Sequence, residues 1–309
     1  MLVRVGTRGS RLSLVQTDLV IQRLRQAHPD LTVERKIVTT KGDQDRRTPL
    51  FFLNQKGIFE REIDQAVLDG GADFAVHSMK DIPVFEENTD LVIAGVPERG
   101  SPADVLVSSG DRILKELGPG SIVGTSSLLR VSQLKRVRPD LKPEPIRGNV
   151  ETRIEKVDRG EFDAVMLAEA GLARLGMTGR IAERLPLEDF IPAPGQGIIA
   201  TVARRDNQRV IDILKTIEHH PTRAEAAAER ELVRVLEGGC KVPVGGIASA
   251  SGDRIHLTAR VLSVDGKERL QVALSGHAID PVGLGRKVGE EMLARGAKRF
   301  EEEWRKLYR

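Results

Sequence analysis

The feature that most constrains the fold is a strand-to-helix pattern that occurs twice along the chain. Residues 4–10 read Arg-Val-Gly-Thr-Arg-Gly-Ser, and residues 122–127 read Ile-Val-Gly-Thr-Ser-Ser. A second pair of segments, 69–76 and 158–165, carries Asp and Gly before an apolar strand. Parallel strands that alternate with helices form open α/β sheets. The repetition therefore predicts two similar, doubly wound α/β lobes.

The first lobe is expected to comprise residues 1–98 together with 198–216. Ser10 is placed to cap its first helix, and residues 42–57, which show no hydrophobic period, are expected to form a long lid loop. The predicted elements are helices at 11–27 and 59–69 and strands at 2–5, 31–38, 74–77 and 198–203.

The rest of the chain is expected to form a second α/β lobe at 103–192 and a small α+β domain at 220–309. In the third region a helix is predicted to end at Gly238-Gly239, and Asp265-Gly266 marks a hairpin turn. The other predicted elements are a three-stranded antiparallel sheet, at 247–249, 255–263 and 268–275, and one closing helix from 281 to about 304.

Composition excludes several classes of protein. The 309 residues exceed what one core usually supports, and 40% apolar with 30% charged residues fits a globular chain. No stretch approaches the roughly 18 apolar residues of a membrane span, and a net charge of +3 does not suggest a nucleic-acid partner. A single cysteine and no export signal indicate the cytoplasm. The balanced charge and 3% aromatic residues favour a monomer.

Cys240 is the only cysteine, and two glycine pairs and Pro243 surround it. Free cysteines usually pack as small buried hydrophobes. The glycine setting and the adjacent Lys241, which favours the thiolate, argue equally for a displayed nucleophile. The residues alone leave both interpretations open.

Charged residues directly follow the apolar strand at 74–77. In open α/β sheets, ligands bind beyond the carboxyl ends of the strands. Asp81 is therefore a candidate catalytic carboxylate, and a helix cap paired with Lys80 is the alternative. A structural role is favoured for His77, because no second ligand stands at a metal-site spacing.

Three turns combine hydroxyls or arginines at the start of a helix, where main-chain N–H groups and the helix dipole attract anions. Each turn alone is explained by ordinary helix capping. Together they predict a site for a ligand with several carboxylates. The residues are Arg8 and Ser10; Thr125, Ser126, Ser127 and Arg130; and Arg147, Gly148 and Arg153.

Eight segments, taken in order, resemble the porphobilinogen deaminases, also called hydroxymethylbilane synthases, over essentially the whole chain. A colinear series of this kind is far more specific than any one motif. The segments are TRGS at 7–10, KGIF at 56–59, VHSMKDIP at 76–83, GTSSL at 124–128, RGN at 147–149, LAEAGL at 167–172, PGQG at 194–197 and GCKVP at 239–243.

The resemblance implies a three-domain transferase whose two lobes are similar to periplasmic binding proteins. Such an enzyme joins four porphobilinogen molecules head to tail, releases ammonia each time, and frees linear hydroxymethylbilane by hydrolysis. The resemblance implies a dipyrromethane cofactor in thioether linkage to Cys240 and no metal. The implied partner is the small-molecule substrate porphobilinogen, in the biosynthesis of tetrapyrroles and haem.

The resemblance also assigns roles to residues. Asp81 matches the catalytic aspartate, and Lys56 matches a residue of the lid. The implied cofactor-binding positions are Cys240, Lys80, Asp81, Thr125, Ser126, Ser127, Arg130, Arg147, Gly148 and Ala168. The implied substrate-binding positions are Arg8, Ser10, Phe59, Arg147, Arg153 and Gln196.

Leu129 departs from the family pattern, in which a cofactor-binding arginine stands at this place. A neighbouring arginine compensates, cofactor assembly is impaired, or the chain is a divergent member. Two other classes are alternatives: a cytosolic two-lobed protein that binds carboxylates, and a transcription regulator that contains such a domain. The lone thiol in its glycine frame argues against the first, and an initial strand in place of a helix-turn-helix argues against the second.

Overall fold

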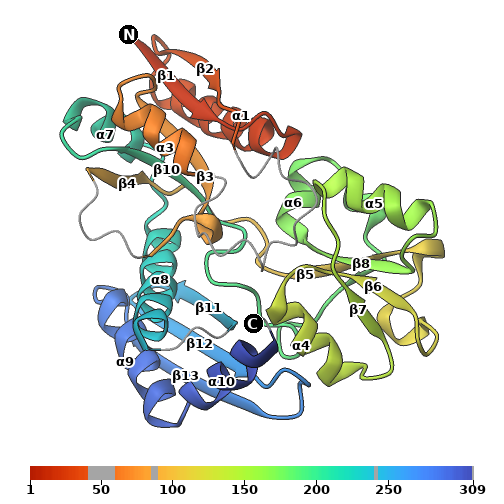
Figure 1. The fold of residues 1–309 in the computed structure, drawn as a ribbon. Helices are drawn as coiled ribbons and strands as arrows, with labels where there is room; N and C mark the ends of the chain where they lie inside the picture. Colours follow the sequence, from red (N-terminus) through yellow and green to blue (C-terminus); the bar gives the residue numbers. More distant parts are fainter. Residues whose placement is uncertain (41–59, 85–89, 240–242, 308–309) are drawn as a thin grey trace. The chain divides into compact units, whose positions relative to one another are not determined.

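The structure is a computed structural model that describes residues 1–40, 60–84, 90–239 and 243–307 (Figure 1). The described residues form two compact units. Unit 1 comprises the described residues up to Gly100 and those from Gly197 to Arg223. We call it the first lobe. Unit 2 takes Ser101–Gln196, the second lobe, together with the C-terminal domain from Ala224 onward. The three domain boundaries predicted from the sequence are finer than this division and stay a prediction.

The first lobe is built on a five-stranded sheet of order β2-β1-β3-β10-β4. Its elements are β1 (Leu2–Thr7), α1 (Arg11–Ala27), β2 (Thr32–Ile37), α3 (Arg61–Leu68), β3 (Phe74–Ser78), β4 (Leu91–Gly95), β10 (Ile199–Arg204) and α7 (Gln208–Lys215). β1 lies parallel to β2 and β3, whereas β10 is antiparallel to β3 and β4. The predicted return of residues 198–203 to this sheet is confirmed, but the sheet is mixed rather than parallel. A parallel neighbour of β3 would need a crossover helix before it. The chain instead reaches β10 after it has passed through unit 2, so β10 runs antiparallel.

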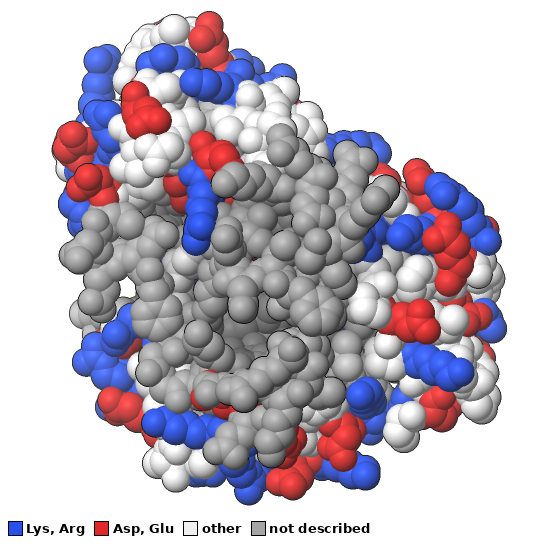
Figure 2. Space-filling model, viewed as in Figure 1, with Lys and Arg blue, Asp and Glu red and all other residues white. Residues whose placement is uncertain are grey.

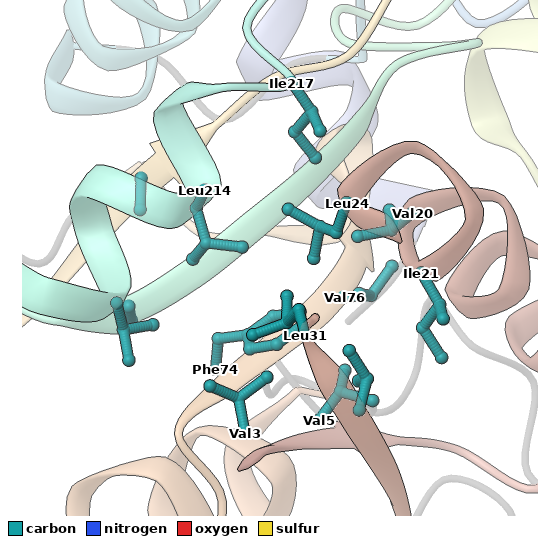
Figure 3. Packing of buried hydrophobic residues seen from close by; sticks show 14 of the residues in the cluster. Val3, Val5, Val20, Ile21, Leu24, Leu31, Phe74, Val76, Leu214 and Ile217 are labelled. Carbon is teal, nitrogen blue, oxygen red and sulfur yellow. The ribbon is translucent and has the colours of Figure 1, made fainter. Parts of the chain in front are cut away.

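Helices cover both faces of this sheet, as the doubly wound prediction requires. Leu24 of α1 and Leu214 of α7 pack against the face that carries Phe74 and Val76 (Figure 3). α3 packs on the other face, where Ala75 points. Phe74, Ala75 and Val76 divide between the faces because successive side chains of a strand alternate.

The second lobe has a sheet of order β7-β6-β8-β5-β9. Its elements are β5 (Asp104–Ser108), β6 (Ile122–Gly124), α4 (Leu128–Val137), β7 (Lys142–Glu144), α5 (Val150–Asp158), β8 (Ala164–Ala168), α6 (Glu169–Arg174) and β9 (Glu183–Arg184). Leu134 of α4 packs on one face with Leu106 and Met166, and Ile154 of α5 packs on the other with Val165. β5 is antiparallel to β8 and β9, so this sheet is also mixed.

The internal repeat predicted from the sequence appears as matching structure in the two lobes. The Asp73 carboxylate accepts the main-chain N–H of Arg4 at 2.6 Å, and the Asp163 carboxylate accepts that of Ile122 at 2.8 Å. Each aspartate precedes an apolar strand and accepts a main-chain N–H of the neighbouring strand. The two strand orders correspond position by position, with β10 and β5 as the antiparallel fourth strands.

The C-terminal domain is a three-stranded antiparallel sheet covered by helices, as predicted. Its elements are α8 (His220–Gly239), β11 (Val244–Ser251), β12 (Arg254–Leu262), β13 (Arg269–His277), α9 (Pro281–Ala294) and α10 (Lys298–Leu307). Leu232 of α8 and Val288 of α9 pack with Leu257 in its core. The buried Trp304 indole donates to the Leu262 carbonyl at 3.1 Å, which fixes α10 against the sheet.

The prediction of one closing helix is wrong, because the chain breaks it into α9 and α10. Gly296 adopts φ +89°, a left-handed conformation that ends helices and that glycine adopts without strain. The Ala297 N–H donates to the Met292 carbonyl at 3.0 Å, which closes the C-terminal turn of α9. The turn lets Phe300 and Trp304 pack into the core.

The second lobe and the C-terminal domain make direct polar contacts within unit 2. Arg260 of β12 is buried and donates to the Glu188 carbonyl at 2.6 Å, and Arg136 of α4 donates to the Gly266 carbonyl at 3.2 Å. Leu128, at the start of α4, packs into the core of the C-terminal domain. The domain that carries the lone cysteine is thus joined to the second lobe.

The described surface in Figure 2 shows acidic and basic side chains interspersed on the face viewed, in keeping with the small net charge of +3. Among the helices that the structure describes, none is long and apolar enough to cross a membrane.

Candidate active site

Asp81 ends a short 3-10 turn, η1 (Met79–Asp81), that directly follows β3. Met79 is buried, and its main-chain N–H donates to the Ile198 carbonyl at 3.0 Å. The N–H of Ile82 donates back to the Met79 carbonyl at 3.2 Å. Lys80 and Asp81 are exposed. The chain therefore presents both charged side chains on a fixed turn at the carboxyl end of β3.

Buried polar side chains support this end of β3. The Gln16 amide of α1 donates to the Ser78 hydroxyl at 3.0 Å. His77 Nε2 lies 2.9 Å from the Asp64 carboxylate of α3, and the His77 side chain is only 4% exposed. This contact gives His77 the structural role that the sequence favoured.

Arg8 and Ser10 follow β1, the parallel neighbour of β3. The Ser10 hydroxyl caps α1 by accepting the Ser13 N–H at 3.3 Å. Because β1 and β3 end at the same edge of the sheet, Arg8 and Asp81 emerge on the same side of the first lobe. The structure thus brings these predicted site residues of the first lobe to one sheet edge.

The Thr125–Ser127 turn joins β6 to α4 in the second lobe. The Ser126 hydroxyl donates to the Ile146 carbonyl at 2.6 Å and accepts the Ile146 N–H at 3.1 Å, so its proton is committed to the protein. The Thr125 hydroxyl accepts the Ser127 N–H, and the Ser127 hydroxyl accepts the Arg130 N–H as the cap of α4. In these contacts the Thr125 and Ser127 hydroxyl oxygens both act as acceptors.

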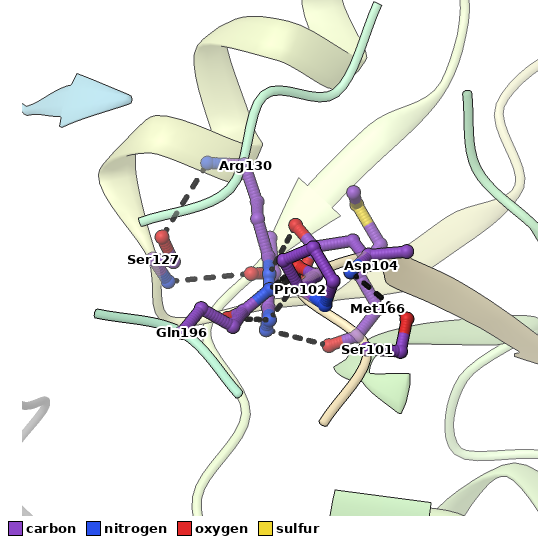
Figure 4. Close-up of polar contacts among 9 residues, drawn as sticks. Ser101, Pro102, Asp104, Ser127, Arg130, Met166 and Gln196 are labelled. Carbon is purple, nitrogen blue, oxygen red and sulfur yellow. Dashed lines mark hydrogen bonds and ion pairs between the residues drawn. The ribbon is translucent and has the colours of Figure 1, made fainter. Parts of the chain in front are cut away.

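Arg130 lies in a buried network with Asp104 and Gln196 (Figure 4). Its Nε and Nη2 donate to the two Asp104 carboxylate oxygens at 3.0 and 2.7 Å. Its Nη1 donates to the Met166 carbonyl at 3.0 Å, and Nη2 reaches Gln196 Oε1 at 3.4 Å. Gln196 Nε2 donates to Asp104 at 2.7 Å and to the Pro102 carbonyl at 2.8 Å. Two predicted ligand-binding residues are thus held by a carboxylate that the motifs did not identify.

Arg147, Gly148 and Arg153 form the junction that leads into α5. Gly148 has φ +113°, and a Cβ there would lie 2.7 Å from Thr152, so only glycine fits. Asn149 caps α5 by accepting the Thr152 N–H at 2.8 Å, and Arg153 Nε donates to the Gly148 carbonyl at 2.9 Å. The turn therefore holds Arg153 next to the loop.

The Arg153 guanidinium is partly buried among like charges. Burial lowers the pKa of Arg153 to about 10, and the neighbouring positive charges of Arg130 and Arg147 add to the effect. Cations that disfavour one another in this way are stabilised by a bound anion. The second lobe thus gathers charge suited to carboxylates.

Ala168 ends β8 and occupies the cap position of α6. Beside it, the Glu169 carboxylate accepts the Ser101 hydroxyl and pairs with Arg184. Burial raises the pKa of Glu169, but the hydrogen bonds from Arg184 and Ser101 outweigh it and hold that pKa below its usual value. Glu169 therefore stays ionised and braces the start of α6.

Two buried carboxylates that contact predicted site segments were not identified from the sequence. Asp104 begins the apolar strand β5, and a charge at the start of a buried strand was the signal that could have revealed it. Glu229 of α8 is fully buried and accepts the main-chain N–H groups of Gly195 at 2.5 Å and Ala248 at 2.7 Å. Within the described ranges, no group of three or more His, Cys, Asp and Glu could hold a metal ion.

Three predicted site residues, Cys240, Lys56 and Phe59, lie outside the described residues. The described chain reaches both flanks of Cys240, with α8 described up to Gly239 and β11 beginning at Val244. The described part of α8 reaches Gly239, so the predicted helix end at Gly238-Gly239 stays a prediction.

Comparison with known families decides the identity of the chain. A family model for the cofactor-binding domain of porphobilinogen deaminase (dipyromethane cofactor) matches residues 3–212, and the model for its C-terminal domain matches residues 223–294. This chain belongs to the porphobilinogen deaminase family. Probable porphobilinogen deaminase of Nitrosopumilus maritimus is 48% identical over 301 residues, which cover 97% of this chain and 96% of that protein. Porphobilinogen deaminase of Desulforudis audaxviator is 46% identical over 295 residues, with coverage of 96% and 95%.

Solved structures that resemble the chain include periplasmic binding proteins. The methionine-binding protein MetQ is 13% identical, with a TM-score of 0.45, over 70% of this chain and 88% of that one. The aliphatic sulphonate-binding protein SsuA of Escherichia coli is 18% identical, with a TM-score of 0.41, over 77% and 71%. The two mixed α/β sheets and the separate antiparallel sheet define the fold without these scores.

As a member of this family, the chain has porphobilinogen deaminase activity in tetrapyrrole and haem biosynthesis. The family uses a dipyrromethane cofactor bound covalently to cysteine, and Cys240 is the one cysteine of the chain. Pyrroles derived from porphobilinogen carry acetate and propionate groups. The gathered cations Arg130, Arg147 and Arg153, with the lowered pKa of Arg153, fit a group of that charge.

Proposed function

We propose that Asp81 carries the chemistry of the condensation. Porphobilinogen loses ammonia from its aminomethyl group, which leaves a cationic methylene-pyrrolenine that a nearby carboxylate stabilises. The dipyrromethane, when bound, supplies an acceptor pyrrole with a free α-carbon. Asp81 takes up the proton that leaves this carbon after the new carbon–carbon bond forms and returns it to solvent. Its exposed position on the pinned turn η1 is the observation that carries this proposal.

Carboxylate binding is divided between the two lobes in this proposal. In the first lobe Arg8, Ser10 and Lys80 meet substrate and cofactor, with Phe59 and Lys56 at the lid. In the second lobe the binding positions are Thr125, Ser126, Ser127, Arg130, Arg147, Gly148, Arg153, Ala168 and Gln196. The proposed domains are 1–98 with 198–216, 103–192, and 220–309 with Cys240 as the tether.

Leu129 is compensated by its neighbours in this proposal. Leu129 is buried, at 5% exposure, at the start of α4. It contributes packing, while Arg147 and Arg153 supply the positive charge that relatives obtain from an arginine at this place. We also infer that the enzyme is cytoplasmic and acts as a monomer. Sedimentation of the purified protein tests the oligomeric state, and a dimer at working concentration contradicts the monomer.

The test is the substitution Asp81→Asn, with Asp111→Asn as its control. Asp111 also ends an exposed 3-10 turn (Ser109–Asp111), and its φ of 53° is a conformation that asparagine tolerates. Asp81→Asn should fold with an unchanged melting temperature and lose nearly all turnover, at least about a hundredfold for a lost acid–base group. Asp111→Asn should behave as the wild type. An Asp81→Asn enzyme with normal turnover removes Asp81 from the central role.

A further inference from the structure

Arg130 has little capacity left for a ligand. An arginine has five N–H donors. Among the residues that the structure describes, Asp104, Met166 and Gln196 use four of them, so one Nη1 hydrogen is left. The Arg130 side chain is 11% exposed and that of Asp104 is 2% exposed. The remaining N–H therefore belongs to a network that is almost entirely buried.

The charge of Arg130 is also compensated. Asp104 faces its Nε and Nη2 in the parallel, two-bond geometry typical of arginine–carboxylate pairs. Asp104 therefore offsets part of the positive charge that Arg130 presents to a ligand. The Gln196 side chain contacts both Arg130 and Asp104. Through this side chain Asp104 also fixes the turn at residues 194–197.

We propose that Asp104 is a positioning residue for the deaminase reaction: it fixes the direction of the one remaining Arg130 N–H toward a bound carboxylate. A free guanidinium samples many rotamers, and fixing one beforehand reduces the entropy lost on binding. This inference rests on the proposed role of Arg130 in ligand binding. Asp104 touches neither substrate nor cofactor and acts through Arg130.

The experiment compares Asp104→Asn, Arg130→Gln and the double substitution D104N/R130Q. In Asp104→Asn, the amide replaces one acceptor oxygen with a donor that faces Arg130 or Gln196, so the network opens. The matched control is Asp140→Asn. Asp140 accepts Arg138 Nε at 2.8 Å and Nη2 at 2.6 Å, a similar pair at the opposite end of α4, on the surface.

The readouts are KM and kcat for porphobilinogen, the cofactor-loaded fraction from intact mass, and the melting temperature. KM is measured where every variant is folded. Asp104→Asn should raise KM by about tenfold, the effect of one hydrogen bond to a charged group, and lower the loaded fraction. Asp140→Asn should leave both unchanged. A purely structural Asp104 would lower the melting temperature and leave the KM of the folded enzyme unchanged, which overturns the inference.

The double substitution covers the case in which Asp104→Asn fails to fold. It removes both charges, so no unpaired buried charge is left, and it should fold. If Asp104 acts through Arg130, its KM should stay within about threefold of that of Arg130→Gln alone. A KM raised about tenfold beyond the single Arg130→Gln value overturns the inference. A wild-type KM and loaded fraction in Arg130→Gln shows instead that the proposed ligand role of Arg130 has failed.

Discussion

Glu229 anchors the two chain segments that flank Cys240, and its replacement by glutamine gives a sharp test. Glu229 lies on α8, which runs to Gly239, and its partner Ala248 lies on β11 beyond the cysteine. Its second partner, Gly195, belongs to the second lobe. Gly195 and Ala248 each donate a main-chain N–H, so each Glu229 side-chain oxygen must accept a hydrogen bond, which only the ionised carboxylate provides.

The magnitude follows from these contacts. Glu229→Gln keeps one acceptor and turns an NH₂ group toward the other N–H, which leaves a buried donor unsatisfied at a cost of about 1–3 kcal/mol. The bond that is kept loses its charged acceptor, which weakens it by roughly 1 kcal/mol. The free energy of unfolding of unit 2 should therefore fall by about 3 kcal/mol.

Urea unfolding followed by fluorescence measures this change, because the one tryptophan, Trp304, is buried in the C-terminal core. Glu225→Gln is the control. Glu225 lies one turn earlier on α8 and accepts the main-chain N–H of Ala250 at 3.1 Å, which a glutamine oxygen can still accept. The free energy of unfolding of Glu225→Gln should fall by less than about 1 kcal/mol. Equal losses in the two variants would refute this account of Glu229.

Two further predictions concern the second lobe. Gly148→Ala places a Cβ at φ +113° and 2.7 Å from Thr152, so it should displace the Arg147–Arg153 junction and raise KM by at least about tenfold; an unchanged KM contradicts the role of this turn. Leu129→Arg buries a charge that a bound carboxylate can pair with, so cofactor loading should raise the melting temperature more in this variant than in the wild type. If cofactor loading raises the melting temperature equally in Leu129→Arg and the wild type, the side chain at position 129 does not reach the cofactor.

The sequence predicted the elements best where local signals agree. The helix at 11–27 was predicted with its observed bounds, because Ser10 caps it and the apolar spacing is continuous. The break at Gly296 was missed, because a single glycine inside a periodic pattern is tolerated in many helices. The antiparallel direction of β10 depends on the long excursion through unit 2, which no local pattern encodes.

The candidate site was predictable in position but not in its internal contacts. The motifs placed Asp81 directly after the strand at 74–77 and Arg130 just beyond a strand-to-helix turn, and in the structure Asp81 ends η1 and Arg130 lies in the first turn of α4. They did not show whether those side chains are already used by the protein. The Asp104–Arg130 and Asp104–Gln196 contacts join residues 26 and 92 positions apart, so only the folded chain reveals them.

The intact mass of the purified protein tests the central claim, that Cys240 tethers the dipyrromethane on which porphobilinogen is condensed. The active wild-type protein should carry the added mass of two pyrrole units, and Cys240→Ser should carry none and be inactive. An aldehyde colour test for pyrroles should follow the same pattern. An active protein whose mass is that of the unmodified chain would contradict the account.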